Sequence, residues 1–194
     1  TIDPDDRILP TSQFDIWLTQ TPSARWQSLV APWLITSRVS GLVGKEESKN
    51  VAPLGPELDR VAAAPLRKLT LRLLQESEGT APQFASLLAL AQWSTPARRS
   101  GGISSDYIQW TLREAEWLGL TGQGAISKYA TALLAGEDLD VIDQDLPKPV
   151  DHILIQSDHT AIAPGPLEHE IAQELAILAE IESRGGATVY RFSE

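Results

Sequence analysis

The chain has 194 residues, which is enough for one or two small domains with a buried core. It contains no cysteine, so disulfides and thiolate metal sites are excluded. No apolar run approaches the roughly 20 residues that span a bilayer, and we expect a cytoplasmic protein without membrane partners.

The net charge of −10 is distributed unevenly along the chain. Residues 1–60 contain eight acids and six bases, whereas residues 61–136 contain five acids and seven bases. Residues 137–194 contain thirteen acids and three bases, which would repel a phosphate backbone. Only the middle third is electrostatically suited to nucleic acid.

Residues 1–64 predict a helical segment followed by a linker. Thr21 can cap a helix whose first position is Pro22. Residues 39–65 are rich in glycine, proline and charge, which is typical of a connection rather than a domain.

Residues 65–136 predict a winged-helix-like domain. Three helical patterns follow one another, reading "PLRKLTLRLLQES", "PQFASLLALAQ" and "SSDYIQWTLREAEWLGL". The next stretch, "LTGQGAIS", places apolar residues on both sides of a Gly-Gln-Gly turn and predicts a hairpin. Ser127 can cap a last helix, which Gly136 closes. This order is typical of a winged helix, a variant of the helix-turn-helix.

Residues 137–150 read as an acidic linker, and residues 151–194 predict a small β-β-α-β domain. Two short strands, "HILIQ" and "TAIAP", flank a tight turn that has His159 at its tip. The helix "GPLEHEIAQELAILAEIES" ends at "RGG", where glycine is typical of a C-cap, and "ATVYRF" returns as a strand. The predicted fold class is α+β and mainly helical.

Three motifs of this last domain belong together. The hairpin reads "QSDHTAIAPG", the helix contains "ELAILAEIESRGG", and the closing strand reads "TVYRF". They resemble the XPB/Ssl2-like helicase N-terminal domain, as found in actinobacterial helicase-associated proteins that lack the motor. Two earlier stretches, "VAPLGPEL" and "TLREAEWLGLTGQGAISKYATALLAG", resemble segments of the same proteins. The resemblance implies a role in DNA repair or transcription and a domain that is incomplete at its C-terminal end.

Catalytic motifs are absent from the sequence. "GLVGKEES" has the wrong spacing for a phosphate-binding loop and a glutamate after its lysine. No nucleophile elbow, metalloprotease helix or cysteine nucleophile is present. We therefore expect no ATPase, nuclease or hydrolase activity on this chain, and no cofactor.

Basic side chains of the middle third are the candidates for holding phosphates. The third helix carries Asp106, Glu114 and Glu116 beside its one arginine, which makes a poor surface for a DNA groove. The alternative is a solvated basic face. The candidates are Arg67, Lys68, Arg72, Arg98, Arg99, Arg113 and Lys128.

Two tryptophans of the third helix are candidates for docking a protein partner. Trp110 and Trp117 lie seven residues apart, with Arg113 between them. They either pack against the N-terminal segment or form an exposed docking face.

The three histidines all fall within residues 151–171. The hairpin separates His159 from the other two, but Asp151, His152, Glu168 and His169 can converge at the opposite end of the strands. They form either a divalent-metal site or the solvated, acidic start of a helix.

These observations favour a non-catalytic helicase-associated module that binds DNA, weakly or only together with the full-length protein. The first alternative is a protein interaction scaffold that uses the winged helix for docking. The second alternative is a regulatory domain that binds a divalent metal.

Overall fold

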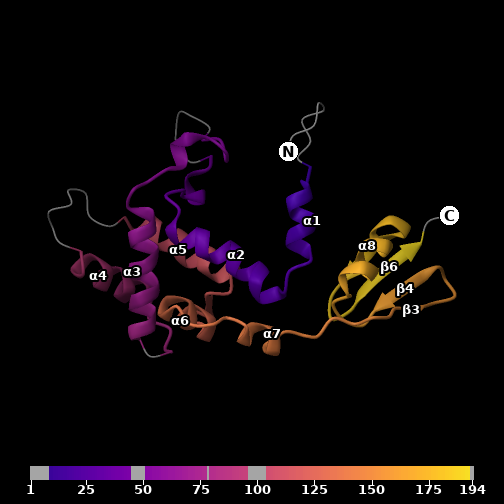
Figure 1. The fold of residues 1–194 in the computed structure, drawn as a ribbon. Helices are drawn as coiled ribbons and strands as arrows, with labels where there is room; N and C mark the ends of the chain where they lie inside the picture. Colours follow the sequence, from indigo (N-terminus) through magenta and orange to yellow (C-terminus); the bar gives the residue numbers. More distant parts are fainter. Residues whose placement is uncertain (1–8, 45–50, 78, 96–103, 193–194) are drawn as a thin grey trace. The chain divides into compact units, whose positions relative to one another are not determined.

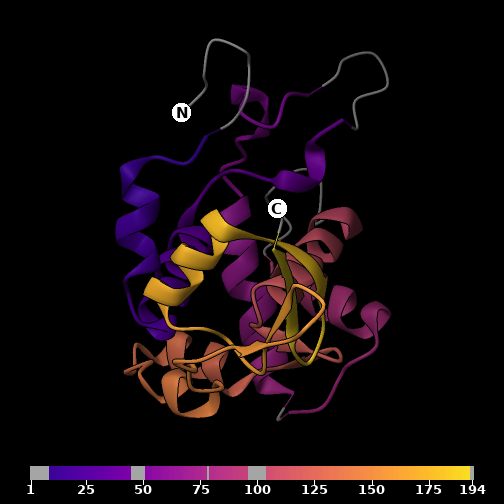
Figure 2. The same cartoon turned by 90° about the vertical axis from the view of Figure 1, so that its right-hand side faces the viewer.

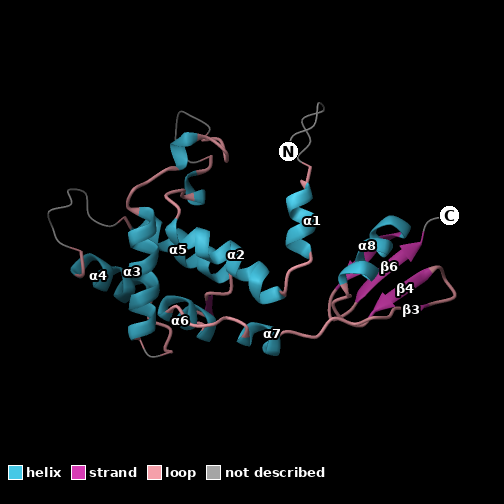
Figure 3. Cartoon of the chain, viewed as in Figure 1, coloured by secondary structure: helices cyan, strands magenta, loops and turns pink. Residues whose placement is uncertain are grey.

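The computed structural model describes residues 9–44, 51–77, 79–95 and 104–192 (Figure 1). The chain divides into two compact units, one formed by Trp26–Leu139 and the other by Thr1–Arg25 together with Asp140–Glu194. Helices dominate, and small antiparallel sheets complete the structure (Figure 3). The predicted α+β, mainly helical fold class is confirmed. Among the described residues, no helix is long and apolar enough to cross a membrane.

The first unit, called here the helical unit, is built on three central helices. Its core includes Val30, Leu71, Leu74, Leu87 and Ile108, which are all buried. The elements in chain order are α2 (Pro22–Ile35, which contributes from Trp26 onward), η1 (Ser40–Leu42), η2 (Pro56–Leu58), α3 (Ala63–Glu76), α4 (Phe84–Trp93), α5 (Ser105–Trp117), β1 (Thr121–Gly122), β2 (Ala125–Ile126) and α6 (Lys128–Ala135).

The predicted hairpin and caps of this unit are confirmed. β1 and β2 pair antiparallel, and the turn residues Gln123 and Gly124 have φ values of 51° and 82°. Two central residues with positive φ are the pattern of a type I′ turn, which matches the twist of the strands. The Ser127 hydroxyl accepts a hydrogen bond from the Ala130 amide, and Gly136 ends α6 in the left-handed conformation.

The stretch predicted as a connection packs into the helical unit instead. Val39, Val51 and Leu58 are all buried. The Val39 amide donates to the Leu58 carbonyl at 3.0 Å, which fastens the two ends of the stretch together. These apolar residues follow no helical or strand period, so the pattern did not reveal them. Most of the predicted segment 1–64 therefore belongs to the same compact unit as the predicted domain 65–136.

The second unit contains two short helices, α1 (Ser12–Leu18) and α7 (Val141–Asp145), and the four-stranded sheet. α7 lies in the predicted acidic linker 137–150. The Asp143 carboxylate accepts hydrogen bonds from the amide and the hydroxyl of Ser23, at 2.9 and 2.5 Å. Because Ser23 lies in the first turn of α2, this carboxylate satisfies a backbone donor that the helix leaves open.

The sheet region, residues 150–192, is a β-β-α-β-β arrangement. Its elements are β3 (Leu154–Ile155), β4 (Thr160–Ala163), α8 (His169–Leu178), β5 (Ala179–Arg184) and β6 (Thr188–Phe192). The strand order is β3-β4-β6-β5, and every pair is antiparallel. α8 lies alongside this sheet in both views (Figures 1 and 2).

The prediction of one long helix before a single closing strand is wrong. The helix ends at Leu178, and Ala179–Arg184 is a strand paired with β6. Gly185 and Gly186 form the turn of a hairpin and are not a helix cap. Because β6 pairs with β4 on one side and β5 on the other, its backbone groups are satisfied on both edges.

Candidate functional site

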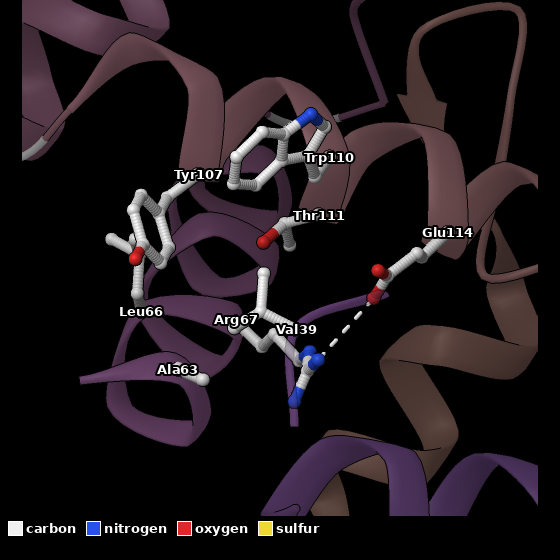
Figure 4. A pocket seen from close by; sticks show the side chains of 8 residues that line it. All are labelled: Val39, Ala63, Leu66, Arg67, Tyr107, Trp110, Thr111 and Glu114. Carbon is white, nitrogen blue, oxygen red and sulfur yellow. Dashed lines mark hydrogen bonds and ion pairs between the residues drawn. The ribbon is translucent and has the colours of Figure 1, made fainter. Parts of the chain in front are cut away.

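Arg67 was predicted to hold phosphates, and the structure corrects this. Its residue is only 3% exposed, and its guanidinium donates to the carbonyls of Trp33, Thr36 and Arg38 at 3.1, 2.7 and 2.5 Å. Nη2 also lies 3.3 Å from Oε2 of Glu114 (dashed line in Figure 4). Burial lowers the pKa of Arg67, and the Glu114 carboxylate partly offsets this shift. These contacts use the side chain inside the fold and leave it no access to DNA.

Glu114, on α5, joins three other elements at this point. Its carboxylate accepts from Trp33 Nε1 of α2 at 2.6 Å, from the Ser40 hydroxyl of η1 at 2.5 Å and from Arg67 of α3. Glu114 is 8% exposed, so it is not one of the surface acids of the third helix that the sequence suggested. The Arg67–Glu114 pair therefore holds the 33–40 stretch against α3 and α5.

A spacing signal could have revealed this pair. Arg67 lies four residues after Ala63 and three before Thr70, and both of these are buried on α3. Glu114 lies four residues after buried Trp110 on α5. A single charge on the buried face of each of two neighbouring helices indicates an ion pair in the core.

The small cavity beside the pair does not offer a ligand site. Its volume is about 10 Å³, which is room for about one water molecule. Its lining consists of Val39, Ala63, Leu66, Arg67, Tyr107, Trp110, Thr111 and Glu114 (Figure 4). The polar groups of the lining already bond one another, so the arrangement is structural.

Four of the remaining predicted cations are exposed on the helical unit. Lys68 and Arg72 lie one turn apart on α3, Arg113 lies on α5, and Lys128 begins α6. The Lys128 ammonium lies 5.2 Å from the centre of the Tyr129 ring. Arg98 and Arg99 fall outside the described residues.

The two predicted docking tryptophans have different environments. Trp110 is 8% exposed and packs with Val39 and Ala63, so its prediction as a docking residue is wrong. A Cβ on Gly41 would overlap its ring, which explains the glycine at that position. Trp117, in contrast, is 76% exposed at the end of α5.

The metal candidates gather only in part. The backbone of Val150 bonds Pro166 and Glu168, at 2.7 and 3.0 Å, so the two chain segments do converge. Asp151 pairs with its neighbour His152 at 3.0 Å, and this hydrogen bond lowers the pKa of Asp151. Within the described ranges, no three His, Cys, Asp or Glu side chains are grouped as a metal site requires. The arrangement, to which His169 adds no described partner, does not support the metal-binding alternative.

His159 lies at the tip of the β3–β4 turn, as predicted. Its φ is 64°, and its carbonyl accepts from the Phe192 amide at 2.9 Å. The tip is shaped by Asp158, whose carboxylate accepts from the amide and the hydroxyl of Thr160. His159 is therefore a turn residue, with its backbone tied to the end of β6.

Comparison with known proteins places one part of the chain. Residues 153–194 match a family model described as the helicase conserved C-terminal domain. The match covers less than half of the chain and coincides with the sheet region. Neither the curated proteins nor the solved structures include a match. The sheet region is thus helicase-related, which agrees with a helicase-associated module.

Proposed function

We propose that this protein is a non-catalytic, helicase-associated module of nucleic-acid-processing machinery, and that its helical unit makes weak contacts with DNA. The observation that carries the proposal is the helicase match over residues 153–194, in a chain whose residues 61–136 hold the net positive charge. The finer relationship, to the XPB/Ssl2-like domain and a role in repair or transcription, rests on the sequence motifs. The lack of any phosphate-binding loop or nucleophile motif supports a non-catalytic role.

The helical unit supports phosphate contacts better than base reading. Its three helices, hairpin and trailing helix follow the order of a winged helix, and we include that assignment in the proposal. The exposed side of α5 presents Asp106 and Glu116 against one cation, Arg113, which disfavours insertion into a groove. Lys68 and Arg72 form a basic pair on α3. Contacts of this kind position a protein on DNA without selecting a sequence.

The test is the salt dependence of duplex binding, measured by fluorescence anisotropy. Each lost phosphate contact should lower the slope of log K against log salt by about 0.9, so a Lys68→Glu/Arg72→Glu variant should lose about 1.8. Lys148→Glu is the control, because it reverses an exposed charge in the acidic linker. Unchanged slopes in the double variant, or no binding of the full chain at low salt, would refute the proposal.

Protein docking by α5 is a second candidate function, and the exposed Trp117 indole favours it. Exposed tryptophans commonly anchor protein interfaces, and Arg113 lies one turn before this one. Acrylamide quenching isolates the Trp117 signal as the emission lost in Trp117→Phe. If α5 docks protein, saturating DNA should leave this quenching unchanged. Protection of Trp117 by DNA would assign the face to DNA instead.

A further inference from the structure

The junction of α8 and β5 exposes three large apolar side chains, called here the junction patch. Ile177 is 85% exposed, Leu178 59% and Ile181 43%. Leu175, one turn earlier, is buried. Because the chain turns from helix to strand at Ala179, the apolar stripe of α8 stops facing the fold at this point. Three adjacent exposed aliphatic side chains are unusual for a surface that stays in water.

Acidic side chains border the junction patch. Glu174 lies one turn before Leu178, and Glu180 precedes Ile181 on β5; both are exposed. Glu182 is neutralised by Arg191, whose Nη2 lies 2.9 Å from its carboxylate. Among the described residues, Glu174 and Glu180 have no such ion pair. The border therefore carries two uncompensated negative charges.

We propose that the junction patch is a docking surface for a protein segment that presents apolar side chains together with lysine or arginine. Removal of the aliphatic groups from water supplies affinity, and the two carboxylates select a basic partner. The same carboxylates repel nucleic acid and anionic membrane surfaces. This inference concerns the sheet region and does not depend on DNA binding by the helical unit.

A second copy of the chain fits the patch poorly. A two-fold interface places the same surface of each copy against the other, so Glu174 and Glu180 would face their own counterparts. β5 is also an edge strand, and a bulge between Ile181 and Ser183 interrupts the regular strand that edge-to-edge pairing requires. Charge and edge geometry both favour a different, basic partner.

The test is selection of peptides from a random displayed library on the immobilised full chain. We expect the enriched peptides to combine aliphatic residues with lysine or arginine. Ile177→Ser and Glu180→Lys should each weaken their binding about tenfold or more. Val61→Ser is the matched control, because Val61 is 95% exposed in the helical unit, and it should leave binding unchanged.

Three results would overturn the inference. One is the absence of any enriched peptide, and another is enrichment of peptides without basic residues. The third is self-association in analytical ultracentrifugation that Ile177→Ser abolishes, because it would assign the patch to a second copy.

Discussion

Replacement of Arg67 by methionine should destabilise the helical unit by about 3–5 kcal/mol. Methionine fills much of the same space but leaves the buried Glu114 carboxylate without its cation. It also removes the donors from three carbonyls of the 33–38 stretch, those of Trp33, Thr36 and Arg38. Since small domains are stable by about 5–15 kcal/mol, such a loss would take a large part of the unit's stability.

Urea unfolding followed by far-ultraviolet circular dichroism measures this effect. Arg113→Met is the control, because it removes an exposed arginine from α5 and should change stability by only about 0.5 kcal/mol or less. In the double variant Arg67→Met/Glu114→Gln the uncompensated charge is gone, while the glutamine oxygen can still accept from Trp33. That variant should be more stable than the sum of its single changes predicts. An Arg67→Met protein as stable as the Arg113→Met protein would refute the role of the buried pair.

Two further predictions concern single contacts. Gly41→Ala should destabilise the helical unit by about 1–3 kcal/mol, because its Cβ would overlap the Trp110 ring; a melting temperature equal to that of the parent protein would contradict this packing. The Thr160 hydroxyl holds the pKa of Asp158 below its ordinary value of 3.8, so this bond stabilises the fold fully above that pH. The contribution is lost as the pH falls through the lowered pKa. In an NMR titration, Thr160→Val should raise the Asp158 pKa toward 3.8, and an unchanged pKa would exclude the hydroxyl as the cause.

The exposure of Trp117 and the burial of Trp110 change how the third helix is understood. Both indoles lie on α5, seven residues apart, and neither their spacing nor their neighbours distinguish them. Trp110 is buried because the 39–41 stretch folds over it, with a glycine where a side chain would collide. α5 therefore presents one exposed indole rather than an aromatic pair.

Features that depend on neighbouring residues were predictable from the sequence. The Gln123-Gly124 turn and the Ser127 and Gly136 caps were identified correctly, because each depends on the conformational freedom or hydrogen bonding of one or two residues. The mainly helical class and the tight turn at His159 follow from equally local signals. The motifs of the last domain also indicated a helicase relationship, which the match over residues 153–194 supports.

Tertiary packing decided the features that depend on distant partners. Gly185 and Gly186 suit a helix end and a hairpin turn equally well, and only pairing of β5 with β6 selects the turn. Arg67 looks like a surface cation until the 33–40 stretch and Glu114 surround it. In both cases the local conformational preferences are nearly balanced, so contacts between residues far apart in the chain determine the outcome.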